Sequence, residues 1–248
     1  MPEPRPLAHC PIIEALFDVR ASAGANVAAE AFDAAAEILD RRGYVRKGPI
    51  VEQIVAFGGN SDSPEPRTAQ RLLGTRFHSA DELFVAQFTT SGCTVSRLRP
   101  YTTWDDLHRE ATALWQVYRQ IAEPKGLTRV ATRYINELML PVSPALMLQD
   151  YLRAPPLLPD DLPGPPTNFL QRFVVHDRET EAQVIVTQAR QRPDVQDHVP
   201  ILVDIDCFVE RPFDADGNEA FRLLEQLRVV KNRIFFRLLT ERALQLFL

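Results

Sequence analysis

The sequence is poor in lysine, cysteine and histidine. Of its 28 basic residues only three are lysines, at positions 47, 125 and 231, and the rest are arginines. The three cysteines stand far apart without CxxC spacing, so neither a disulfide framework nor a zinc knuckle is indicated. The five histidines form no HxH or HxxxH pair. We therefore expect no metal and no other cofactor.

Long hydrophobic runs are also missing. No window approaches the roughly 18 apolar residues that cross a bilayer, and the first residues lack the apolar core of a secretory signal. We therefore expect a cytoplasmic protein without membrane association. The net charge of −5 argues against general nucleic-acid binding, which needs a basic face. The composition, 45% hydrophobic and 25% charged, is typical of a globular protein.

Hydrophobic periodicity divides the first part of the chain into strands and helices. Alternating apolar residues predict strands at 11–20, 51–57, 71–78, 83–89, 94–99 and 128–140, and Gly-rich, Pro-containing residues 58–66 predict an exposed loop. Residues 27–42 and 103–122 are expected to be helices. Thr103 is expected to be the N-cap of the second helix, since Asp105 and Asp106 follow it and suit the positive end of the helix dipole.

A proline-rich segment separates this part from the rest of the chain. Residues 151–168 hold six prolines, too many for regular structure. We expect strands at 169–176, 182–189 and 200–211, followed by one long helix over 219–248. The predicted organisation is an N-terminal half 1–153, a connector 154–168 and a C-terminal half 169–248, integrated into one unit.

The predicted fold class is α+β, with antiparallel sheets covered by helices. Three strands and a helix occur twice, around 71–122 and 169–248, which predicts two β-β-β-α pseudo-repeat halves. Apolar residues occupy most of the circumference of the last helix. Such a helix must be buried on more than one side, so the other half or a second subunit should cover it, and we favour a homodimer.

Three carboxylates share one face of the last strand. Asp204, Asp206 and Glu210 stand at alternate positions, where they could bind a divalent cation or act as an acid and base pair. Arg129 and Arg133 alternate in the same way on an earlier strand and offer cross-strand partners. We favour the structural reading, in which no metal binds and at least one of the acids pairs with arginine.

Other polar strand residues are candidates for binding. Glu14 lies on the polar face of the first strand, and Asn136 interrupts a well-patterned one. A buried asparagine must satisfy its amide, either by anchoring neighbouring backbone or by contacting a ligand. We take Arg129, Arg133, Asn136 and Glu14 as the candidate binding residues.

Several short motifs occur together along the chain. They are PIIEA at 11–15, RLRPY at 97–101 followed by Trp104, TRYIN at 132–136, DID at 204–206 and the leucine-rich last helix. In this combination the chain resembles a sporadically distributed, uncharacterised bacterial family of about 250 residues. That family commonly has a Leu-His pair at the start of its last helix, where this chain has Leu227 and Arg228. The resemblance implies one integrated unit and implies no activity.

The function expected from these features is binding. The sequence has no catalytic motif, its sheet faces could receive an extended segment, and its arginines suit acidic groups. We expect a non-enzymatic accessory protein that holds a peptide or protein partner, in peptide natural-product biosynthesis or in a defence or toxin-antitoxin pair. The alternative is a metal-dependent hydrolase or transferase that uses Asp204, Asp206 and Glu210.

Overall fold

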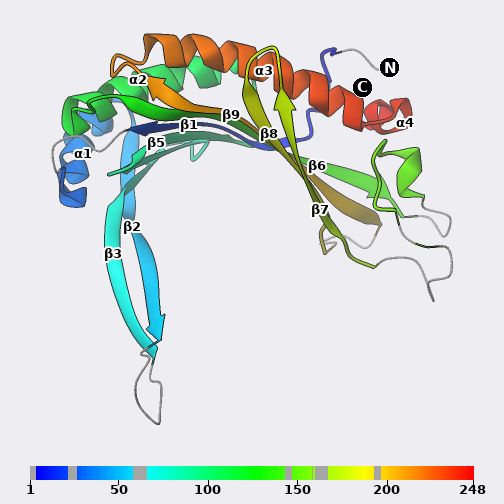
Figure 1. Cartoon of the computed structure of the whole chain (residues 1–248), viewed down its shortest axis with the longest axis horizontal. Helices are drawn as coiled ribbons and strands as arrows, with labels where there is room; N and C mark the ends of the chain where they lie inside the picture. The colour runs from blue at the N-terminus through cyan, green and yellow to red at the C-terminus, as the bar shows by residue number, and fades with distance from the viewer. Residues whose placement is uncertain are drawn as a thin grey trace.

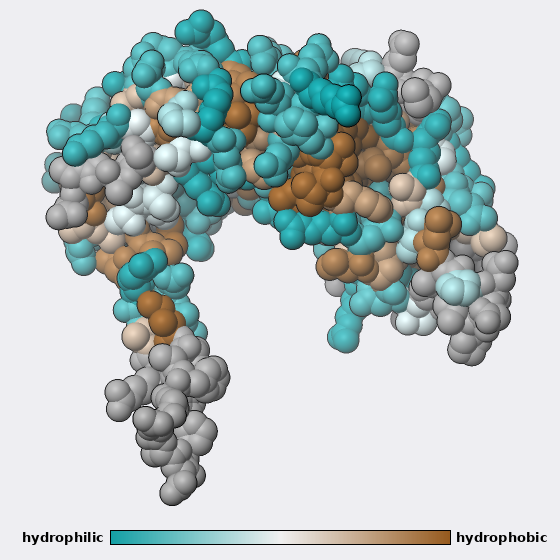
Figure 2. Space-filling model, viewed as in Figure 1, coloured by the Kyte–Doolittle hydropathy of each residue, from teal (hydrophilic) through white to brown (hydrophobic). Residues whose placement is uncertain are grey.

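The chain folds around a single antiparallel β-sheet with helices on one of its faces (Figure 1). The computed structural model describes residues 4–21, 27–57, 66–142, 147–157, 159, 167–192 and 197–248. Within these residues the fold is α+β, as the sequence predicts. Figures 1 and 2 show the outline of an arch, from which the β2–β3 hairpin extends.

Among the described residues, nine strands form the sheet. In chain order they are β1 (Ile12–Ala21), β2 (Tyr44–Phe57), β3 (Pro66–Ser79), β4 (Phe84–Thr89), β5 (Gly92–Leu98), β6 (Leu127–Pro141), β7 (Leu170–Asp177), β8 (Ala182–Arg190) and β9 (His198–Phe213). In space the order is β2-β3-β4-β5-β1-β6-β9-β8-β7, and every neighbouring pair is antiparallel. The sequence suggested more than one sheet. The structure joins them because β6, before the proline-rich connector, pairs with both β1 and β9.

Two long helices cover the sheet side by side (Figure 1). Helix α2 (Trp104–Ala122) lies against β1 and β5, and α3 (Asn218–Leu238) lies against β6 and β9. Strand residues at alternate positions, such as Phe17 and Tyr134, point to the helices and are almost fully buried. Thr103 caps α2 as predicted, because its hydroxyl accepts a hydrogen bond from the Asp106 amide at 3.1 Å.

Two of the predicted helices are interrupted. Residues 27–42 contain a 3₁₀ segment, η1 (Ala29–Ala34), followed by the short α1 (Ala35–Asp40). The last helix was expected to reach residue 248, but α3 ends at Leu238. The chain then turns into α4 (Glu241–Leu244) and η3 (Gln245–Phe247).

The turn after α3 has a clear physical cause. Leu239 adopts an extended conformation and pairs with Leu152, which lies between η2 (Leu148–Asp150) and the connector. The Thr240 hydroxyl then accepts from the Ala243 amide at 3.2 Å and so caps α4. Leu244 and Phe247 of the apolar tail are therefore buried within this chain, whereas Leu246 and Leu248 are exposed. The homodimer stays a prediction.

The proposed halves and connector are partly outside the described residues. The loop expected at 58–66 lies there except for its last residue, Pro66, which begins β3; of the connector, residues 158 and 160–166 lie there too. The division at 153 and 169 and the pseudo-repeat both stay predictions. In the part of the chain that the structure describes, no helix is long and apolar enough to cross a bilayer.

Candidate functional site

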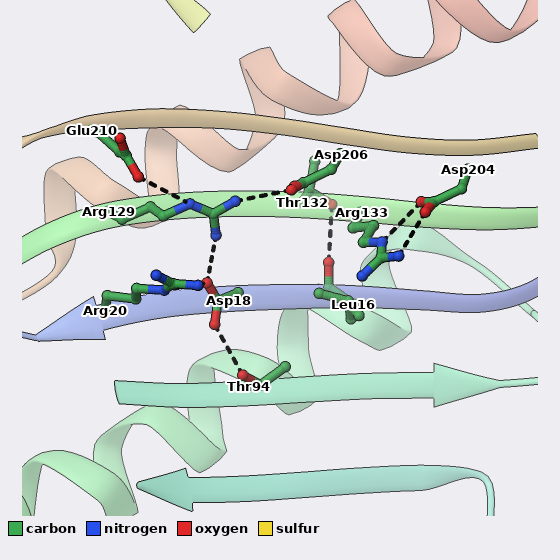
Figure 3. Close-up of polar contacts among 10 residues, drawn as sticks. All are labelled: Leu16, Asp18, Arg20, Thr94, Arg129, Thr132, Arg133, Asp204, Asp206 and Glu210. Carbon is green, nitrogen blue, oxygen red and sulfur yellow. Dashed lines mark hydrogen bonds and ion pairs between the residues drawn. The ribbon is translucent and has the colours of Figure 1, made fainter. Parts of the chain in front are cut away.

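Arg129 of β6 is the centre of a polar cluster on the sheet face away from the helices (Figure 3). Its Nη1 donates to Oδ2 of Asp18 in β1 at 2.5 Å, and its Nη2 donates to Oδ2 of Asp206 in β9 at 3.0 Å. Its Nε lies 3.7 Å from the Glu210 carboxylate. The guanidinium also lies 4.4 Å from the centre of the Phe208 ring. One buried arginine thus links three neighbouring strands.

A second arginine forms a separate pair beside this cluster. Arg133 donates from Nε and Nη2 to the two carboxylate oxygens of Asp204, at 2.8 and 2.6 Å. This two-point contact holds both side chains in one orientation. Glu14 contributes only a longer-range attraction to Arg133. The expected pairing of at least one acid with arginine is confirmed for Asp204, Asp206 and Glu210.

The chemistry open to these acids is limited by their partners. Burial raises the pKa of Asp206, while Arg129 and Arg133 oppose that rise. Asp204 and Asp206 already have their negative charge compensated by a guanidinium at hydrogen-bond distance. Among the described residues, no group of three or more His, Cys, Asp or Glu side chains is arranged to hold a metal ion. The cluster therefore fits a role in holding β1, β6 and β9 in register.

Asn136 lies apart from the arginines, on the face that the helices cover. Its Nδ2 donates to the Val203 carbonyl at 2.9 Å and to the Tyr134 carbonyl at 3.3 Å. The side chain thus anchors backbone, which is the first of its two expected roles. It also lines a cavity beneath α3.

The edge strand β7 is exposed along most of its length. Alternate residues point to its two faces, and both faces expose apolar side chains: Leu170, Phe173, Val174 and Val175 are 74%, 40%, 64% and 49% exposed. Figure 2 shows hydrophobic residues gathered where Figure 1 places β7 and β8. Its pairing with β8 runs without a register shift, so the outer edge is regular. An exposed, regular, apolar edge is a template for another strand.

The opposite edge of the sheet has a different character. Strand β2 has two register shifts against β3, and it contains Lys47, Gly48 and Pro49 near the first of them. Proline lacks an amide hydrogen, and bulges twist an edge away from further pairing. These are the usual means by which proteins block an edge. These features are confined to the first part of β2, where Val45 is exposed, and Val51 and Ile54 are exposed farther along the strand. Among the described residues, β7 has no such bulge and no proline.

Comparison with known proteins adds no family to this description. No protein-family model matches the chain, and no curated protein matches it in sequence. The resemblance to a bacterial family stays an expectation.

Reasoning from the sequence missed two features of the structure, the position of β7 at the sheet edge and the burial of Lys231. The run 170–177 was recognised as a strand, but its place at the edge depends on pairings with β8 that local sequence does not encode. Lys231 falls among apolar residues at helical spacing on α3, and this was the signal that could have marked it as a buried cation.

Proposed function

We propose that this protein is a non-enzymatic binding protein that holds an extended segment of a peptide or protein partner along β7. The single observation that carries the proposal is the regular, apolar edge of that strand, which no other described strand pairs with. A segment added there would form main-chain hydrogen bonds with β7, and its alternate side chains would meet Phe173 and Val175 on one face and Val174 on the other. Biosynthetic accessory proteins and defence partners both need such capture.

The order of the strands supports this position. From the central pair outward, one side of the sheet runs β1-β5-β4-β3 and the other runs β6-β9-β8-β7. We propose that the two pseudo-repeat units are β3-β4-β5-α2 and β7-β8-β9-α3, with α2 and α3 equivalent. In that case β7 corresponds to β3, and the neighbour of β3 is β2. The second half has no strand in the equivalent position among the described residues, and the partner segment would occupy it.

The proposal is tested with random peptides displayed on phage. Peptides are selected on the wild-type protein and then measured for affinity against Val174→Lys and Val45→Lys. Both valines are exposed on edge strands, at 64% and 53%, but on opposite edges of the sheet. We expect the selected peptides to have apolar residues at alternate positions. Their affinity for Val174→Lys should be about tenfold or more lower than for wild type, a loss of about 1.4 kcal/mol, and their affinity for Val45→Lys should equal that for wild type.

Hydrogen exchange then locates the bound peptide. Amides of residues 170–177 should exchange more slowly in the complex, and those of residues 44–57 should not change. Selected peptides that bind both variants equally, or that protect β2 instead, contradict the proposal. So does a wild-type protein that dimerises through β7 and becomes monomeric on Val174→Lys, because the edge is then occupied by a second copy.

A further inference from the structure

A cavity of about 490 Å³ lies beneath α3, on the face of the sheet opposite the arginine cluster. Its floor is formed by Tyr134 and Asn136 of β6, and its wall by the α3 residues Lys231 and Phe235. Residues 4–7 and 10–12 of the N-terminal segment, residues 101–104 before and at the start of α2, and further residues of α3 also line it. This volume is in the range of pockets that bind small molecules.

Lys231 is the unusual residue of this cavity. It is only 7% exposed, and its Nζ lies 3.7 Å from the centre of the Tyr134 ring. A buried cation is ordinarily paired with a carboxylate, because removing an isolated charge from water is costly. Among the described residues no carboxylate lies within ion-pair distance of this ammonium group, and the electron-rich ring face is its nearest compensation.

The other charges of the lining are already paired. Arg5 contacts Glu241 at 2.7 Å, and Arg228 contacts Glu225 at 2.8 Å. No aspartate or glutamate is among the described residues that line the cavity. Within that part of the chain the Lys231 ammonium group has no counter-charge, and it faces an aromatic wall made of Tyr101, Trp104, Phe235 and Phe236.

We propose that the cavity binds a small monocarboxylic acid with an apolar or aromatic body. The carboxylate of the ligand would meet Lys231 as its missing counter-charge, and the apolar body would pack against the aromatic wall. A carboxylate that accepts a charge-assisted hydrogen bond in a site shielded from water is held more strongly than one on a surface. This site is separate from the β7 edge, so the inference does not depend on the proposed function.

The ionisation of Lys231 in the protein without ligand gives a second measurable consequence of the proposal. Desolvation lowers the pKa of Lys231 from 10.5 to about 7. The titratable and charged groups that act on it are Cys10 of the N-terminal segment, Cys207 of β9 and Arg228 of α3. Tyr134, whose hydroxyl lies 3.4 Å from that of Tyr101, keeps its proton because burial raises its pKa. A bound carboxylate would favour the charged lysine, so binding takes up a proton above neutral pH.

The test is calorimetric titration of the full chain with 2-naphthoate and decanoate, and with 2-naphthalenemethanol as the uncharged probe. Lys231→Met keeps the length and apolar stem of the side chain without the charge, and Lys125→Met changes an exposed lysine as the matched control. We expect one of the acids to bind wild type and Lys125→Met alike. Binding to Lys231→Met should be weaker by about tenfold or more.

The pH dependence of binding distinguishes a carboxylate held by Lys231 from an apolar ligand held by the aromatic wall alone. In buffers of different ionisation heat at pH 8, acid binding to wild type should take up roughly one proton, and the affinity should fall towards pH 9. Lys231→Met should show neither effect. The proposal is overturned if neither acid binds below about 1 mM, if 2-naphthalenemethanol binds as well as 2-naphthoate, or if Lys231→Met binds the acids as wild type does.

Discussion

The ammonium group of Lys231 in α3 lies 3.7 Å from the centre of the Tyr134 ring in β6. The contact joins the second long helix to the central strand pair through a charge and a ring face. Desolvation of this buried group lowers the pKa of Lys231 to about 7.

Replacing Lys231 with methionine should therefore stabilise the protein without ligand. Between pH 7 and pH 10.5 the unfolded chain binds a proton that the folded chain lacks, so wild-type stability should rise with pH in that window. Below it both states are protonated and the dependence ends. Lys231→Met should lose this dependence and melt roughly 5 °C or more above wild type at pH 7. Calorimetry from pH 6.5 to 9.5 measures both, and equal melting temperatures at pH 7 contradict the expectation.

Replacing Arg129 with methionine should be strongly destabilising. The change leaves the carboxylates of Asp18 and Asp206 close together without their shared partner, at a cost of about 3–5 kcal/mol. Arg109→Met is the control, because Arg109 is 71% exposed and its pair with Asp106 is worth less than about 0.5 kcal/mol.

The loss in free energy of unfolding caused by Arg129→Met should become smaller as the pH falls. Without the guanidinium, the already raised pKa of Asp206 rises further, so the folded state binds a proton that the unfolded chain has released. Stability then returns on acidification from pH 7 to pH 5. Urea unfolding of the variant and of Arg129→Met with Asp206→Asn measures this. If Asp206→Asn does not reduce the stability lost in Arg129→Met, this contradicts a role for Arg129 in compensating the charge of these acids.

Gly92 at the start of β5 should not tolerate alanine. Its φ is +152°, and an added Cβ would lie 2.2 Å from the Val19 carbonyl oxygen of the neighbouring strand. Gly43→Ala is the control, since Gly43 also has a positive φ but has open space around it. We expect losses of about 3 kcal/mol and about 1 kcal/mol respectively in chemical denaturation. Equal losses show that close approach of the strands adds nothing to backbone strain.

Thr240 should matter more than an ordinary helix cap. Its hydroxyl accepts a hydrogen bond from the Ala243 amide and donates one to the Asp150 carbonyl at 2.5 Å, so it joins the C-terminal tail to η2. Thr240→Ala should cost about 2 kcal/mol and speed amide exchange in residues 241–247. Thr103→Ala, which removes only the cap of α2, should cost about 1 kcal/mol. Tail amides that stay protected in Thr240→Ala contradict this role.

Much of the secondary structure could be predicted because its causes are local. Alternation identified the regions of all nine described strands, although β2 starts seven residues before its predicted position, at Tyr44. Thr103 signalled the start of α2 through its hydroxyl and the acids after it. The end of α3 could not be predicted, because Leu239 leaves the helix to pair with Leu152, far away in the sequence.

The pairing of aspartates with arginines in the candidate site was predictable from the sequence, but the position of Arg129 between three strands was not. Alternation placed Asp204 and Asp206 on the face that Arg129 and Arg133 share, so their pairing followed from the pattern. The third partner, Asp18, depends on β1 lying next to β6, which the sequence does not reveal. Lys231 was visible only as a charge among apolar residues, and its lack of a carboxylate is a property of the folded chain alone.

The shifted register of β2 has a consequence for assembly. Sheets grow into fibrils when each added strand presents a new edge as receptive as the last. Among the described strands, the proposal lets growth begin at β7, while the first part of the opposite edge carries a bulge and Pro49. A copy that docked through its own β7 would present its β2 edge outward. If β7 accepts a strand as proposed, addition of a second copy would then end at that edge and would not start a filament.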